Sequence, residues 1–442
     1  MSLSLYKVYQ DENGEDLSLY IGNEKVYSQE PVVPGYIPLE EIERVIRSPI
    51  MKRYTKVYLL HDDETVAKDI TEWVQSTGSI EKNSESGQCR STNLTFANPL
   101  VYKNIIDRYE GYGTKNSVPE VRFNPMMMYD DLQSNVKIKI VTGVEFYGKI
   151  YEVDQGIFVV FDPKMSENAA NSSLTIQLYD KFALLDGTIS GDGEFEYEIP
   201  VNTLIYDAIK QLILLPKNKR GEPFDTKEII FPAKYRNARL AYTVKKTGEN
   251  AIGELIKEMC KSISCDVKYN AFGNLTVSDT LEDLDAHYRQ VSWNFQENSS
   301  EYQNPSVDIK RSQIKNRVVV VGANINGFLC KGTAENTDPN SLYSIYGPFG
   351  TRSIKIEDNL IPSNSMCEER ARYELQKSMR KYIILSFQCT WIPHLEPGDI
   401  VRLTKTDWHI DDEEFVINSI SLPTNGKDLM SISMTNLKEI SR

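Results

Sequence analysis

The feature that most constrains the fold is a period-two alternation of apolar and polar residues. It is clearest in residues 135–162, where Ile138 and Ile140 face one way and Lys137 and Lys139 face the other. Successive side chains of a strand point to opposite faces of a sheet, so this pattern predicts strands with one buried face. Two glycine steps inside the stretch predict turns between these strands: Thr142-Gly143 and Gln155-Gly156.

A second alternating stretch lies far along the chain. Its apolar positions are Ile383, Leu385, Phe387, Cys389 and Trp391. Directly after it, "CTWIPHLEPGDIVRLTK" (389–405) predicts two strands joined as a hairpin by a Pro-Gly-Asp turn, because proline and glycine favour turn conformations. An Asn-Gly step at 425–426, between two further alternating runs, predicts another hairpin.

The middle of the chain changes to a helical period. "VNTLIYDAIKQLILL" (201–215) predicts a helix that stops at Pro216, and the apolar residues of 250–265 recur on one helix face. "CDVKYNAFGNLTVSD" (265–279) predicts a hairpin with a Gly-Asn turn. These elements predict a small α+β domain between two β modules.

A further helix is predicted before the second alternating stretch. Ser365 and Glu368 have the spacing of a capping box, in which each side chain bonds the backbone N–H of the other residue. The apolar residues that follow recur every fourth position and form one stripe: Cys367, Ala371, Leu375 and Met379. A short helix is also predicted after Pro38, within an otherwise extended arm at residues 1–50.

Composition narrows the function classes. A chain of 442 residues suggests about three domains. The formal net charge is −13 and no basic stripe or tail is present, which argues against a general binder of nucleic acid or anionic membranes. No apolar run reaches the 18 residues of a membrane span, and the first residues lack a signal-peptide pattern. The six cysteines form no CxxC pair, so we expect free, mostly buried thiols.

Residues that could carry chemistry do not form a recognised motif. His61 in "HDDE" and His409 in "WHIDDEEF" lack metal-ligand spacing, so these acidic clusters are predicted to be solvated turns. His287 is predicted to be a surface residue and His394 a turn residue. "VVVVGANING" (318–327) lacks the dinucleotide-binding glycine spacing.

Two other stretches contain residue types found in functional sites, but we predict structural roles for both. "DGTISGDGEFEYE" (186–198) is predicted to be a glycine-rich turn rather than a calcium loop, and Met126–Met128 a core or interface plug. We therefore predict no catalytic residue, no metal site, no cofactor and no enzyme activity, and the sequence identifies no binding residue. A glycosidase with paired carboxylates stays open, because 63 acidic residues always supply candidate pairs.

Several motifs, taken in order, resemble the tail-hub or baseplate-hub proteins of bacteriophages and of contractile tail-like particles. Proteins of this family often close with an A-x-x-x-L helix, a strand and a P-x-L-x-P-G-D-x-V element. The matching residues here are Ala371, Leu375, Pro393, Leu395, Pro397, Gly398, Asp399 and Val401. Earlier matching stretches are "DIT" (69–71), "RSTNLTFAN" (90–98), "GVEFYGKIYEVD" (143–154), "IQLYDKFALL" (176–185) and "VKYNAFGNLTV" (267–277).

The resemblance implies a mainly β fold, in which two tube-like antiparallel β-barrel domains flank a small α+β domain. The expected boundaries are an arm at 1–50, a first barrel at 51–199 with an insertion near 100–130, an α+β domain at 200–289 and a second barrel at 290–442. In this scheme the alternating face that starts at Ile383 fills a barrel core, and the stripe that starts at Cys367 caps the barrel or contacts a neighbour.

The function implied by the resemblance is structural. Such a protein is a homotrimeric hub of a virion tail tip or baseplate, made in the bacterial host cytoplasm. It joins the six-fold tail tube, or a distal tail protein, to a three-fold spike or tip protein. It also contacts the tape-measure protein and lines the channel for DNA without binding it specifically, and no membrane insertion is expected. The net charge of −13 is compatible with such a channel because acidic groups repel phosphates.

Two other functions remain open from the sequence. One is a tail-associated enzyme that degrades the cell wall. The other is a receptor- or glycan-binding tail protein, in which the tyrosine-rich region 100–130 would contact sugars. Both contractile and non-contractile tails remain compatible with the sequence.

Overall fold

The computed structural model describes most of the chain. The described residues are 2–4, 8–10, 16–21, 24–26, 39–48, 51–85, 87–96, 137–167, 172–191, 193–217, 221–240, 243–248, 251–278, 291–297, 302–325, 327–379, 383–425 and 428–437. The expected insertion at 100–130, with Met126–Met128, lies outside them, as does His287. None of the helices in the described part is long and apolar enough to cross a membrane.

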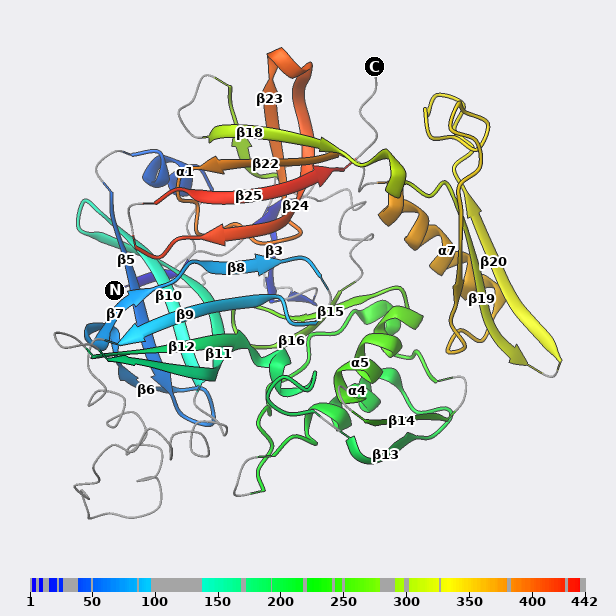
Figure 1. Cartoon of the computed structure of the whole chain (residues 1–442), viewed down its shortest axis with the longest axis horizontal. Coiled ribbons are helices and arrows are strands. Elements are labelled where there is room, and N and C mark those ends of the chain that lie inside the picture. The colour runs from blue at the N-terminus through cyan, green and yellow to red at the C-terminus, as the bar shows by residue number, and fades with distance from the viewer. Residues whose placement is uncertain are drawn as a thin grey trace.

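Strands from both halves of the chain form one large sheet (Figure 1). Its first half contains β5 (Lys52–Leu60), β6 (Val66–Asp69), β7 (Val74–Thr77), β8 (Ile80–Asn83), β9 (Arg90–Phe96), β10 (Lys137–Phe146), β11 (Lys149–Glu167) and β12 (Ser172–Asp180). Its second half contains β17 (Val291–Phe295), β18 (Tyr302–Ile309), β22 (Ile383–Cys389), β23 (Ile400–Lys405), β24 (Ile410–Leu422) and β25 (Met430–Asn436).

The main path of the sheet is β18-β22-β25-β24-β8-β9-β12-β11-β10-β5-β6. Its neighbours are antiparallel, whereas β17 joins β23 in parallel at the side. The predicted mainly β, antiparallel fold is therefore confirmed. The described strands form an open path, and closure into two barrels is not detected among them.

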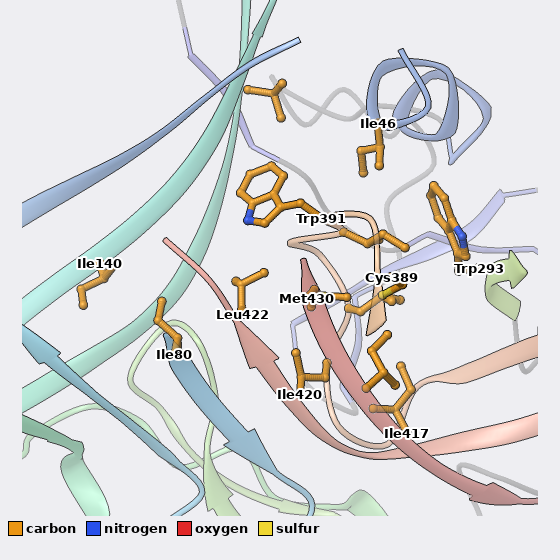
Figure 2. Close-up of a cluster of buried hydrophobic side chains, with 14 of the residues drawn as sticks. Ile46, Ile80, Ile140, Trp293, Cys389, Trp391, Ile417, Ile420, Leu422 and Met430 are labelled. Atoms are coloured by element: carbon orange, nitrogen blue, oxygen red, sulfur yellow. The ribbon is translucent and has the colours of Figure 1, made fainter. Parts of the chain in front are cut away.

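The two halves of the sheet meet where β24 pairs with β8. The register places Ser419 opposite Asn83, Ile420 opposite Lys82, Ser421 opposite Glu81 and Leu422 opposite Ile80. Figure 2 shows Ile80 and Ile140 of the first half pointing into the same cluster as Trp391, Ile420 and Leu422 of the second. Ile46 of α1 (Leu39–Ile46), the predicted short helix, packs into this cluster too. One hydrophobic core therefore serves both halves.

The predicted alternating faces are confirmed in this core. Leu94 and Phe96 of β9 are buried, as are Ile138 and Ile140 of β10. In the second half, Leu385, Phe387, Cys389 and Trp391 are buried, and only Ile383 is half-exposed. Burial of one face in each strand fixes the register, since a slip by one residue would reverse every side chain.

The two predicted glycine turns are wrong. Thr142 and Gly143 lie inside β10, and the turn to β11 is made by Tyr147 and Gly148, both with positive φ. Gln155 lies inside β11, at a shift of register where Gly156 pairs with Ile140 and Asp154 with Val141. Gln155 is thus the extra residue of a β-bulge, which turns its side chain toward other parts of the molecule.

The predicted Pro-Gly-Asp hairpin is also wrong. The segment joins β22 to β23, but β22 pairs with β18 and β25, whereas β23 pairs with β17 and β24. The turn itself pairs with β24, because the N–H of Gly398 donates to the carbonyl of Ile417 and the N–H of Ile417 donates to that of Asp399. Gly398 has a φ of 101°, a conformation that favours glycine. The segment is therefore a crossover between strands that are not neighbours.

The middle of the chain forms a separate cluster of helices and short strands. It contains β13 (Gly193–Ile199), α4 (Ile205–Ile213), β14 (Val244–Gly248), α5 (Ala251–Ser262), β15 (Asp266–Tyr269) and β16 (Leu275–Ser278). The predicted apolar face of α5 is buried in this cluster, as is the apolar face of α4. The predicted β15–β16 hairpin is present, and the Asn270 side chain accepts hydrogen bonds from the N–H groups of Phe272 and Asn274 in its turn.

A second small unit projects beside the sheet (Figure 1). It contains β19 (Arg317–Ile325), β20 (Phe328–Glu335), β21 (Ser353–Glu357) and α7 (Asn364–Met379). The Ser365 capping box is not formed, because the hydroxyl of Ser363 accepts the N–H of Met366 instead. The stripe of α7 packs on Val318, Val320 and Ala334 of this three-stranded sheet. The expectation that it caps a barrel is therefore wrong.

Two glycines let α7 approach its sheet closely. A methyl group on Gly332 would overlap the backbone of Cys367 and Glu368, and one on Gly322 would lie 2.7 Å from the Sγ of Cys367. We expect Gly332→Ala to lower the stability of this unit by about 1–3 kcal/mol, because helix backbone cannot move aside as a flexible side chain can. Faster hydrogen exchange in α7 would report it. Thr333→Ala, at an exposed neighbouring position, is the control and should leave exchange unchanged.

The N-terminal arm contains short strands. β2 (Val8–Gln10), β3 (Asp16–Ile21) and β4 (Glu24–Val26) form a small antiparallel sheet, and β1 (Ser2–Ser4) pairs in parallel with β11. The sequence predicted an extended arm, whereas the described residues of the arm form a small sheet and one strand of the large sheet.

The two halves of the large sheet repeat one strand pattern. In chain order, β9, β10, β11 and β12 of the first half correspond to β22, β23, β24 and β25 of the second, with the same antiparallel neighbours. Both β11 and β24 also shift register in their pairing with the strand that follows, between Phe161 and Lys164 in one and between Ile417 and Ser419 in the other. The chain therefore contains a structural repeat, although sequence identity does not reveal it.

Candidate functional site: two buried ionic clusters between the units

The crossover at residues 393–399 touches three parts of the molecule. Its backbone carbonyls accept hydrogen bonds from side chains of the first half-sheet and of the middle unit. The donors are Gln155 Nε2 to Pro393 (3.0 Å), Lys82 Nζ to Leu395 (3.5 Å) and Lys268 Nζ to Pro397 (3.2 Å). The bulge in β11 is what directs Gln155 to this segment. The crossover therefore acts as the junction of the chain.

Glu396 in this crossover holds two buried cations of the first half-sheet. Its Oε1 lies 2.8 Å from Lys82 Nζ, and its Oε2 lies 2.6 Å from Arg90 Nη2. The Lys82 and Arg90 side chains are only 1% and 6% exposed. We call Glu396, Lys82 and Arg90 the crossover triad. It brings together charges that are more than 300 positions apart in the sequence.

The two cations favour the charged form of Glu396. Burial alone would raise the pKa of Glu396, but the charges of Arg90 and Lys82 outweigh it and hold that pKa well below its usual range. Burial lowers the pKa of Lys82, and Glu396 opposes this shift. The attraction between opposite charges therefore compensates for their removal from water, provided that all three groups are present.

Asp180 supports the triad from the next strand. Its carboxylate accepts the N–H groups of Cys89 (2.7 Å), Arg90 (2.8 Å) and Phe182 (2.9 Å). Burial raises the pKa of Asp180 to about 6, against the effect of the three backbone donors. These bonds hold the start of β9, and with it Arg90, in place.

A second cluster joins the first half-sheet to the middle unit, and we call it the Glu64 cluster. Glu64, whose side chain is 3% exposed, lies 2.6 Å from Lys181, 2.9 Å from Lys137 and 2.7 Å from Lys227. Asp225 of the middle unit lies 2.8 Å from Lys181 and accepts the hydroxyl of Tyr269 at 2.7 Å. Burial alone would raise the pKa of Glu64, but Lys181 and Lys137 lower it to about 2.

These clusters are what sequence reasoning missed. Glu64 belongs to the "HDDE" stretch predicted to be a solvated turn. Asp62 and Asp63 are exposed there, but the side chain of Glu64 is only 3% exposed. Lys137 was predicted to lie on the face away from the core, yet its side chain is only 3% exposed. Alternation indicates which face a residue occupies. It does not indicate that another unit covers that face.

The histidines of the described residues do not assemble a site. His409 is exposed and ends a short 3₁₀ helix with a φ of 54°. His61 makes backbone hydrogen bonds with Thr65 and Glu64 in the turn after β5, and His394 packs against Trp293. Within the described ranges, no group of three His, Cys, Asp or Glu side chains is arranged to hold a metal ion. All six cysteines are free thiols, and only Cys330 is partly exposed.

Comparison with known proteins connects this architecture to a fold. No protein-family model matches the chain, and no curated protein sequence matches it. Among solved structures, it is similar to the tail protein from Neisseria meningitidis MC58, with a TM-score of 0.55 and 12% identity over 87% of this chain and 96% of that one. The chain has the fold of a phage tail protein. The tail-protein fold recurs in the 43 kDa tail protein of prophage MuSo2 from Shewanella oneidensis, with a TM-score of 0.51 and 13% identity over 87% of this chain and 99% of that one.

The similarity extends over nearly the whole length of both tail proteins. The likeness therefore covers far more of the chain than one common motif such as the Pro-Gly-Asp turn. At 12–13% identity, the likeness concerns the fold.

Proposed function

We propose that this chain is a structural virion protein, the homotrimeric hub of a phage tail tip or baseplate. The observation that carries the proposal is the tail-protein fold over 87% of the chain. In this role the hub joins the tail tube, or a distal tail protein, to a spike or tip, contacts the tape-measure protein and surrounds the path of DNA. The protein acts by assembly rather than by catalysis.

The joined sheet supports a mechanical role. Residues 51–199 and 290–442 supply two wall segments in this proposal, and 200–289 supplies the α+β unit beside them. Pairing of β24 with β8, the shared core and the crossover triad hold the segments as one body. A chain with two such segments contributes two positions to a ring, so three chains give the six positions that a six-fold tube requires.

One face of the second half-sheet suits a channel wall. Ser386, Ser433 and Ser419 are opposite one another on three adjacent strands, and Ser431 and Ser421 form the next row. All five are half-exposed and uncharged. Because binding of DNA depends largely on cations that contact phosphates, such a face lets a strand pass without holding it. Ser421 donates a hydrogen bond to the exposed carboxylate of Glu81 at 2.6 Å, so an acidic group borders these serines and adds repulsion of phosphates. We propose this cation-free serine face for this part of the channel.

The first test is the mass of the protein in solution. By light scattering coupled to size exclusion, we expect about three times the chain mass of 50.5 kDa, because each hub contains three chains. End-on electron micrographs of the same sample should show a six-lobed ring with a pore. A stable assembly of another copy number would contradict the trimeric hub. Antibodies to the chain should bind one end of the tail in particles that contain it, and labelling along the tail would contradict the location.

A further inference from the structure

The Glu64 cluster holds an amine and a carboxyl group in contact and away from water. Lys181 Nζ lies 2.8 Å from Asp225 Oδ1, and the two side chains are only 0% and 4% exposed. Lys181 Nζ also lies 2.6 Å from Glu64 Oε1 and donates to the carbonyl of Gly273 at 2.8 Å, so the nitrogen is fixed in place. Groups fixed in contact in this way react with each other far more readily than the same groups free in solution.

Both carboxyl oxygens of Asp225 accept hydrogen bonds that favour addition of a nucleophile to its carbon. Oδ2 accepts the hydroxyl of Tyr269 at 2.7 Å, and Oδ1 accepts the backbone N–H of Lys227 at 3.0 Å. Tyr269 itself is only 1% exposed. A donor aimed at a carbonyl oxygen stabilises the negative charge that develops there when a nucleophile adds. The Tyr269 hydroxyl therefore lies where such a charge needs a partner.

The charges of the cluster are not balanced. Glu64 forms ion pairs with three lysines, Lys137, Lys181 and Lys227. Burial lowers the pKa of Lys137, and the charge of Lys181 lowers it further, against the opposing effect of Glu64. If Lys181 and Asp225 lose their charges together, this repulsion ends and two charges are removed from a site without water. Glu64 still keeps Lys137 and Lys227 as partners.

We propose that Lys181 and Asp225 form an amide (isopeptide) bond in the folded chain, with Glu64 transferring a proton. First, one proton passes from Nζ to Oδ1, which gives a neutral amine and a neutral acid. Nζ then attacks Cγ, the Tyr269 hydroxyl stabilises the charge on Oδ2, and Glu64 takes a second proton from the nitrogen. Glu64 returns this proton to the Oδ1 hydroxyl, the Cγ–Oδ1 bond breaks, and one water leaves. The step needs no oxidant and no cofactor.

The bond joins two units of the molecule covalently. Lys181 follows β12 of the large sheet directly, and Asp225 belongs to the middle unit. Because the site excludes water, hydrolysis back to the two side chains is suppressed. A cross-link between distant residues also limits the freedom of the unfolded chain and so stabilises the folded one. The reaction occurs once in each chain, and the inference is independent of the hub proposal.

The mass of the full-length wild-type chain tests the bond. After denaturation, intact mass spectrometry should give a chain lighter than its sequence by about 18 Da, the mass of one water. Tryptic digestion should then release one branched peptide that contains Lys181 and Asp225. The same chain supplies a matched control, because Lys246 Nζ lies 2.6 Å from Glu258 Oε1 but these side chains are 29% and 46% exposed. Their peptides should be recovered unlinked.

Two results would overturn the bond. One is the full mass of the sequence after prolonged incubation of the folded protein, which would leave the Glu64 cluster as a set of ion pairs. The other is a loss of water that maps elsewhere, for example to Asp186, which precedes a glycine and can cyclise onto the next N–H. Neither result bears on the hub proposal, since the number of chains in the assembly is measured separately.

Substitutions test the assigned roles. Lys181→Arg keeps the positive charge but lacks the attacking amine, so this variant should keep the full mass. Tyr269→Phe removes only a hydroxyl and should slow the loss of water about 100-fold, because one donor to the developing charge is lost. Timed cell-free synthesis followed by mass spectrometry measures the rate, and circular dichroism shows that each variant is folded. Tyr346→Phe, at a position that is 80% exposed, is the control. Equal rates for both tyrosine variants would overturn the role of Tyr269.

Discussion

Replacing Glu396 with glutamine is expected to lower the free energy of unfolding by about 3–5 kcal/mol, because it leaves Lys82 and Arg90 buried without their carboxylate. The glutamine has nearly the same shape, so the loss reports charge rather than packing. Urea denaturation followed by tryptophan fluorescence measures it, since Trp293 and Trp391 lie in the core that both half-sheets share. We expect this core to unfold at a lower urea concentration in the variant than in the wild type.

An exposed ion pair supplies the control for Glu396. Glu198 and Lys245 lie 2.9 Å apart with about half of each side chain exposed. Exposed pairs contribute about 0–1 kcal/mol, so Glu198→Gln should hardly move the transition. If Glu396→Gln behaves like this control, the crossover triad does not join the half-sheets, and the junction depends on the shared core and on strand pairing alone.

The Glu64 cluster should make stability depend on acid. The folded-state pKa of Glu64 is about 2, below its ordinary value of 4.5. A lowered carboxyl pKa stabilises the folded state fully above the unfolded value, because the folded protein then holds the charge more favourably than the unfolded chain. This contribution is lost as the pH falls from about 4.5 toward 2.

Glu64→Gln is expected to remove this contribution, with a loss of about 3–5 kcal/mol at neutral pH, since Lys137 and Lys181 stay buried. The stability difference between wild type and variant should shrink between pH 4.5 and 2. Thermal denaturation at a series of pH values measures this difference. Asp62→Asn, an exposed neighbour, is the control and should follow the wild type within about 0.5 kcal/mol. A difference that stays constant with pH would show that Glu64 acts by shape rather than by charge.

Periodicity and turn residues in the sequence predicted several helices and strands correctly. The apolar face of α5, the core faces of β9, β10 and β22, and the β15–β16 hairpin follow from periodicity and turn residues within a few positions. These features depend on neighbours in the sequence, so the sequence contains them directly. The resemblance to hub proteins, carried by the order of several weak motifs, likewise agrees with the tail-protein fold.

Long-range pairing could not be predicted in this way. The residues "PGD" indicate a turn, but which strands flank it depends on pairings of β22 and β23 with distant partners. Gln155 looks like a turn residue because a glycine follows it, whereas the bulge that contains it is defined by β10. Glu64, Lys82 and Glu396 resemble surface charges, since only their distant partners make them interior groups. The candidate site was missed because it consists of such contacts.

The crossover triad has a consequence for the order of synthesis. Arg90 and Glu396 are separated by 306 positions. At about 5–20 residues per second, the ribosome adds Glu396 about 15–60 s after Arg90. During that interval the first repeat lacks the carboxylate that its two buried cations require, and β8 lacks β24. The first repeat therefore completes its folding only after the second repeat has emerged, so the joined sheet forms in finished chains and not in nascent ones.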